Sequence, residues 1–137
     1  MSQTEMELDS VRRATLKDEW VVLLKEKRGD RYLHIYVGST QANVIKRALE
    51  DKPFSESEGD SCGLPHIATI LPMTESALVT IMRFEGCTFI AELLINYRSR
   101  SYQVELPVAK AMALGLRARA HFYTDDLVLD KAGVTAI

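Results

Sequence analysis

Hydrophobic and polar residues alternate, or apolar β-branched residues crowd together, in seven segments typical of strands. These segments lie at 6–13, 20–27, 31–37, 77–84, 87–97, 101–105 and 120–124. Short turn sequences join three neighbouring pairs: Arg-Gly-Asp at 28–30, Glu-Gly at 85–86 and Arg-Ser-Arg at 98–100. Such short connections favour β-hairpins, so most strands are expected to pair with antiparallel neighbours.

Other segments repeat their apolar residues every three or four positions, the spacing of helices. The pattern predicts helices over about 40–50 and 107–118, a weaker one over 64–73, and a short one capped by Asp125. The 107–118 segment begins with Pro107 and is apolar nearly all round, which predicts burial on several sides. About three to four helices between hairpins indicate an α+β domain with a mixed, mainly antiparallel sheet.

Length and composition fit one compact domain over residues 1–137. Of the 137 residues, 47% are hydrophobic and 26% are charged, as in an ordinary soluble domain. The polar, acidic segment 51–63, rich in Ser, is predicted to be a flexible loop. No apolar run is long enough for a membrane span, and the acidic start does not resemble a secretory signal. We therefore expect a cytoplasmic protein without membrane attachment.

Charge and cysteine content narrow the possible chemistry. The formal net charge is −2, so binding of a polyanion would require a local basic patch. The two cysteines, Cys62 and Cys87, have neither the spacing of a metal site nor that of a disulfide framework. Both are expected to be free thiols, with Cys87 packed as a small apolar residue in a strand.

Few residues stand out as candidates for catalysis, because no glycine-rich phosphate loop, HExxH motif or GxSxG motif occurs. His66 follows Pro65 at the start of a predicted helix beside the loop, which is a better place for ligand contact than the strand positions of His34 and His121. Glu105, at a strand-to-helix junction, could provide one carboxylate for Mg²⁺.

Two long segments resemble a known family. They are E-W-V-V-L-L-K-E-K-R-G-D-R-Y-L-H-I-Y-V-G-S-T-Q-A-N-V-I at 19–45 and Y-Q-V-E-L-P-V-A-K-A-M-A-L-G-L-R-A-R-A-H-F-Y-T-D-D-L-V-L-D-K-A-G-V at 102–134. In residues and element order they are similar to the bifunctional nuclease domain family, over about residues 5–134. The resemblance implies a compact α+β domain that forms dimers and hydrolyses RNA and DNA.

The resemblance also carries expectations for individual residues. It implies catalytic roles for His66 and Glu105, with Glu105 as a metal ligand and Mg²⁺ or Mn²⁺ as the cofactor. Arg31, Gln41 and Lys110 are expected to bind the substrate, which the family's activity implies is a nucleic acid. A single strand is the expected form of this partner.

Some polar positions of the family's pattern are changed. The Glu at the family's helix start is Gln41 here, and its Arg, Ser and second Asp correspond to Pro107, Ala109 and Lys110. Exchanging a carboxylate for Lys110 inverts the local charge and disfavours a metal ion. Three readings therefore stay open: a nuclease, a catalytically inactive dimeric binding or regulatory module, and a nucleic-acid binder without catalysis.

Overall fold

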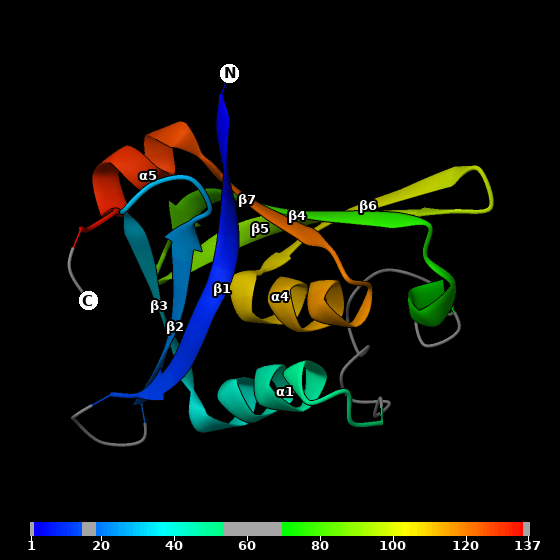
Figure 1. Cartoon of the computed structure of the whole chain (residues 1–137), viewed down its shortest axis with the longest axis horizontal. Helices are drawn as coiled ribbons and strands as arrows, with labels where there is room; N and C mark the ends of the chain where they lie inside the picture. The colour runs from blue at the N-terminus through cyan, green and yellow to red at the C-terminus, as the bar shows by residue number, and fades with distance from the viewer. Residues whose placement is uncertain (1, 15–18, 54–69, 136–137) are drawn as a thin grey trace.

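The computed structural model describes residues 2–14, 19–53 and 70–135, which form one seven-stranded sheet and three α-helices (Figure 1). The strands are β1 (Gln3–Arg13), β2 (Glu19–Glu26), β3 (Tyr32–Gly38), β4 (Ser76–Glu85), β5 (Thr88–Tyr97), β6 (Arg100–Pro107) and β7 (His121–Asp125). The helices are α1 (Ser39–Leu49), α4 (Val108–Arg117) and α5 (Asp126–Ala132), with a short 3-10 helix, η1 (Leu71–Met73). The predicted α+β class is confirmed.

The sheet consists of two antiparallel halves joined by β7. Its strand order is β3-β2-β1-β7-β4-β5-β6, and the β4–β7 pairing is the parallel one. Phe122 of β7 has Met6 of β1 as its partner on one side and Val79 of β4 on the other. The mixed, mainly antiparallel sheet predicted from the hairpins is therefore present, with a short strand from near the C-terminus at its centre.

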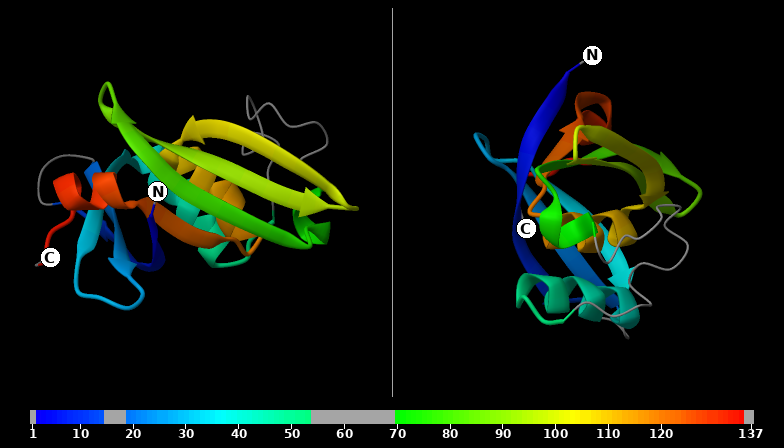
Figure 2. Two further views of the ribbon diagram at one scale, coloured as in Figure 1. Left: turned by 90° about the horizontal axis from the view of Figure 1, so that it is seen from above. Right: turned by 90° about the vertical axis from the view of Figure 1, so that its right-hand side faces the viewer.

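Two helices form a layer beside the sheet. α1 packs on β2 and β3, α4 packs on β4, β5 and β6, and the two helices pack on each other (Figures 1 and 2). They run in the same direction, since Arg47 near the end of α1 and Arg117 at the end of α4 both donate hydrogen bonds to the carbonyl of Pro53. Their N-terminal ends therefore lie at the same end of the layer.

The 107–118 segment is the buried helix that its composition predicts. Seven of the ten residues of α4 are buried, and Met112 and Leu114 are completely inaccessible to solvent. Gly115 lies so close to β4 that a Cβ atom would collide with the side chain of Val79. The small residues of this helix let it approach the sheet closely.

One turn and one cysteine differ from the prediction. Glu85 pairs with Thr88, so the hairpin turn consists of Gly86 and Cys87 rather than Glu85 and Gly86. Gly86 takes the first turn position with a φ of 65°, a conformation that glycine adopts without strain. Cys87 is consequently exposed at the hairpin tip instead of packed in a strand. Its thiol is free.

Several predictions concern residues outside the described ranges, which stop at Pro53 and resume at Ile70. His66, Cys62 and most of the predicted 51–63 loop are among these residues. The weak helical pattern over 64–73 is represented in the described part by its end, where Leu71–Met73 form η1. Among the described helices, none is long and apolar enough to cross a membrane.

Candidate functional site

The first turns of α1 and α4 border a shared cleft. This cleft has a volume of about 240 Å³. Its lining residues are Thr40, Gln41, Val44, Pro107, Ala109, Lys110 and Ala113. The structure therefore brings together two residues assigned to substrate binding, Gln41 and Lys110, although 69 positions separate them in the sequence.

Gln41 has a local structural task in addition to its place in the cleft. Its side-chain oxygen accepts a hydrogen bond from the backbone N–H of Gly38, at 3.0 Å. Gly38 has no side chain with which to return the contact, so only this half of a capping box forms. The bond joins the end of β3 to the first turn of α1 and holds the Gln41 side chain at the mouth of the cleft.

The electrostatics of this cleft favour an anion. Neither α1 nor α4 has an acidic residue in its first turn, so both N-termini retain the partial positive charge of their helix dipoles. Lys110 is half-buried, and among the described residues no carboxylate pairs with it. Two helix N-termini and one ammonium group at the same place form a suitable setting for a phosphate or carboxylate.

The positive charge extends over the whole helix layer. Segments 39–53 and 107–120, which contain α1, α4 and their ends, have six basic and two acidic residues, a net charge of +4. Because the whole chain has a net charge of −2, the remaining residues together carry −6. The helix layer is thus a local basic region on an acidic protein, which the overall composition does not reveal.

Glu105 lies elsewhere. It alternates along β6 with buried Leu106, and it reaches across β5 to Arg83 of β4, whose Nη2 is 2.8 Å from the Glu105 carboxylate. Arg83 also contacts Glu85, with its Nε 2.7 Å from that carboxylate. The hydrogen bond from Arg83 holds the pKa of Glu105 below its usual value. Glu105 does not line the cleft that contains Gln41 and Lys110.

The described residues do not fit a magnesium or manganese ion. Within the ranges that the structure describes, no group of three or more His, Cys, Asp or Glu side chains converges. The Glu105 carboxylate is already paired with the Arg83 guanidinium, and Lys110 would repel a cation at the cleft. The metal role expected for Glu105 therefore finds no partner ligands in the described part of the chain.

Arg31 is held by two carboxylates at the other end of β3 from Gln41. Its Nε lies 2.8 Å from Glu26, and its Nη1 lies 3.0 Å from Asp130 of α5. These bonds join the β2–β3 hairpin to α5, and the hydrogen bond from Arg31 lowers the pKa of Glu26. The substrate-binding role of Arg31 stays a prediction, as does the catalytic role of His66, which lies outside the described residues.

A second hollow, which the sequence does not predict, lies at the C-terminal end of the helix layer. It has a volume of about 640 Å³, and its basic residues are Lys52, Arg117 and Arg119. Arg117 donates hydrogen bonds to the carbonyls of Lys52 and Pro53. The cluster of Arg117 and Arg119 is visible in the sequence, but its meeting with Lys52 depends on the parallel packing of α1 and α4.

Comparison with known proteins identifies the family of this chain. A family model described as "Bifunctional nuclease domain" matches residues 22–136. Two proteins of Mycobacterium tuberculosis, "Uncharacterized protein MT1877" of strain CDC 1551 / Oshkosh and "Uncharacterized protein Rv1829" of strain ATCC 25618 / H37Rv, are each 28% identical over 132 residues. In both cases the match covers 95% of this chain and 76% of the relative. The chain therefore belongs to the bifunctional nuclease domain family.

Proposed function

We propose that this domain binds the phosphate backbone of single-stranded nucleic acid on the basic layer of α1 and α4. The observation that carries the proposal is the cleft at the N-terminal ends of the two helices, where Gln41 and Lys110 meet. A phosphate there would accept hydrogen bonds from the polar lining residues Thr40 and Gln41 and would be attracted by the charge of Lys110. No acidic residue in either first turn would compete with it.

The length of α4 sets the expected size of the binding site. Lys110 and Arg117 are seven residues apart, which is about 10 Å along a helix. In a double helix each strand has one phosphate per 3.4 Å of helix axis, and a single strand is more extended, so at most about three nucleotides would span this distance. The bases need not be read for such binding, because contacts to phosphate carry no sequence information.

Hydrolysis of the bound phosphodiester is the second candidate function, and the family match favours it. In this reading His66 acts as a general base or ligand, and Glu105 assists with Mg²⁺ or Mn²⁺. The alternative is a catalytically inactive binding or regulatory module. The changes at Gln41, Ala109 and Lys110, and the pairing of Glu105 with Arg83, support that alternative.

Binding is tested by fluorescence anisotropy with a labelled single-stranded oligonucleotide over a range of salt concentrations. For the wild type we expect affinity to fall with salt, with a slope of about −0.7 per phosphate contacted. Lys110→Glu should weaken binding and make the slope shallower. Arg28→Glu, the same charge change at an exposed hairpin turn, is the matched control and should change binding much less. Equal losses in the two variants would show that only overall charge matters and would refute the site.

Hydrolysis is tested separately, by incubating single-stranded RNA and DNA with Mg²⁺ or Mn²⁺ and analysing the products on denaturing gels. Cleavage that is lost in His66→Ala and in Glu105→Gln would support the catalytic reading. Absence of cleavage with either metal, together with salt-sensitive binding, would leave the inactive binding module. The expected dimer is tested by sedimentation at micromolar concentration, where a strictly monomeric species would contradict it.

A further inference from the structure

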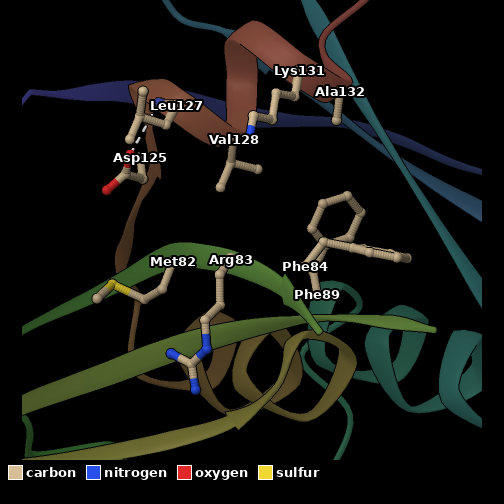
Figure 3. A pocket seen from close by; sticks show the side chains of 9 residues that line it. All are labelled: Met82, Arg83, Phe84, Phe89, Asp125, Leu127, Val128, Lys131 and Ala132. Carbon is tan, nitrogen blue, oxygen red and sulfur yellow. Dashed lines mark hydrogen bonds between the residues drawn. The ribbon is translucent and has the colours of Figure 1, made fainter. Parts of the chain in front are cut away.

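A hollow lies between α5 and the end of the β4–β5 hairpin, away from the helix layer. Figure 3 shows α5 on one side of it and the two strands on the other. Its volume is about 640 Å³, and it shares no lining residue with the cleft of Gln41 and Lys110. Most of its lining is apolar, contributed by Met82, Phe84, Phe89, Leu127 and Val128. This size and lining are typical of sites for small molecules.

A β-bulge shapes the strand side of this hollow. Ile81 pairs with Ala91 and Arg83 with Ile90, so Met82 is the extra residue that has no partner in β5. Bulges of this kind redirect the side chains that follow them. Beyond the bulge, Phe84 packs edge-to-face against Phe89, with ring centres 4.9 Å apart, and both rings lie on the side of α5 in Figure 3.

Two large apolar side chains at the mouth are left uncovered. Phe84 is 59% exposed and faces the hollow from the strand, and Leu127 is 65% exposed and faces it from α5. Exposing both side chains forgoes the stabilisation that their burial would give, which is about 25 cal/mol per Å² of apolar surface. A ligand with an apolar body would bury this surface.

The charged groups around the hollow leave one cation available. Arg83 is bound by Glu85 and Glu105, and its guanidinium points away from α5 in Figure 3. The Asp125 carboxylate accepts a hydrogen bond from the backbone N–H of Leu127, at 3.0 Å, and so caps α5. Lys131 lies one helical turn after Val128, and no described residue forms an ion pair or hydrogen bond with its ammonium group.

From this combination of an open apolar hollow and one available ammonium group, we propose that the domain binds a small amphipathic carboxylate between α5 and the β4–β5 hairpin. The apolar body of the ligand lies against Phe84, Phe89 and Leu127, and its carboxylate faces Lys131. The adaptable Met82 side chain adjusts to the shape of the body. The site works independently of nucleic-acid binding on the helix layer.

The proposal is tested by titrating isotope-labelled protein with decanoate, below its micellar concentration, while amide signals are followed by NMR. We expect the largest shifts at Phe84, Leu127 and Lys131. Lys131→Met should weaken the binding of decanoate about threefold to fivefold, the range for one exposed charge pair. The binding of the neutral analogue decanol should not change. Leu127→Gln should weaken the binding of both ligands. Tyr36→Ser is the control: it removes a similarly exposed side chain on β3, 63% exposed, and should change neither affinity.

Three results would overturn the proposal. The first is the absence of shifts around the hollow at millimolar decanoate. The second is an equal loss of affinity for decanoate and for decanol in Lys131→Met, which would show that the charge of Lys131 does not contribute to binding. The third is a smaller sedimenting species in Leu127→Gln than in the wild type, which would show that a second copy of the chain covers this surface.

Discussion

Gly115 of α4 packs directly on Val79 of β4, with no room between them for even a methyl group. Val79 has no solvent exposure, and Gly115 is buried as well. The contact sets the distance between the helix layer and the sheet. It also explains why a helix that is otherwise rich in Ala and Leu contains a glycine, which costs about 1 kcal/mol relative to Ala in a helix.

The substitution Gly115→Ala should therefore destabilise the protein, although Ala is the better helix former. Overpacking costs about 1–3 kcal/mol and helix propensity returns about 1 kcal/mol, so we expect a net loss of about 1 kcal/mol in the free energy of unfolding. Denaturant unfolding measures it. In a Val79→Ala background the added methyl group has room, so the same substitution should cost less or stabilise. An equal effect in both backgrounds would refute the contact.

A second prediction concerns two threonines that face each other across β1 and β7. Thr4 donates a hydrogen bond to Asp126, at 2.6 Å, whereas Oγ1 of its partner Thr124 is buried without a hydrogen bond to any described residue. Replacing Thr124 by the similarly shaped Val removes an unsatisfied hydroxyl and should stabilise the protein by about 1 kcal/mol. Thr4→Val, the matched control, should destabilise it. Thermal unfolding of the two variants gives the comparison, and a loss of stability in Thr124→Val would contradict it.

The sequence predicts local elements well because their causes are local. Alternation identifies each strand, and turn residues identify the hairpins. The position of β7 could not be predicted in this way, since its pairing with Met6 and Val79 depends on contacts far apart in the chain. The turn between β4 and β5 lies one residue later than the sequence predicts, for a different reason. A Glu-Gly pair resembles the preferred turn dipeptides, but here the strand register places Gly86 first in the turn.

The candidate site was predictable only in part for the same reason. Family resemblance marks Gln41, Glu105 and Lys110, yet only Gln41 and Lys110 share a cleft. The alternation of side chains along β6 turns Glu105 away from α4. Its carboxylate is bound instead by Arg83, which follows the bulge at Met82. The bulge follows from the register of β4 against β5, which the sequence does not reveal. The net charge of the helix layer emerges only once α1 and α4 are known to pack side by side.

A third prediction follows from the pairing of Glu26 with Arg31. Because Arg31 lowers the pKa of Glu26 in the folded protein, this pair stabilises the fold at a pH above the usual Glu pKa of about 4.5. The stabilisation is lost as the pH falls below that value toward the lower pKa of the folded state. Glu26→Gln should cost about 1 kcal/mol near pH 7 and should cost progressively less below pH of about 4.5.

Urea unfolding of the wild type and Glu26→Gln between pH 7 and pH 3 measures this difference. Glu7→Gln changes an exposed carboxylate on β1 and is the control, for which we expect little change at any pH. A difference between wild type and Glu26→Gln that stays constant with pH would show that the ionised form of Glu26 is not the stabilising one.

The fourth prediction concerns the tight turn between β5 and β6. Tyr97 pairs with Arg100, so Arg98 and Ser99 form a two-residue turn, and both have positive φ values, 50° and 62°. Such a turn favours Asn and Gly, and a residue with a Cβ is strained in this conformation. Ser99→Gly should therefore stabilise the protein by about 1 kcal/mol, partly offset by the greater freedom of glycine in the unfolded chain.

Gly86→Ala, at a φ of 65° in the neighbouring hairpin, is the converse change and should destabilise the protein by a similar amount. Midpoints of denaturant unfolding measure both changes, and a destabilised Ser99→Gly variant would contradict the strain at this turn.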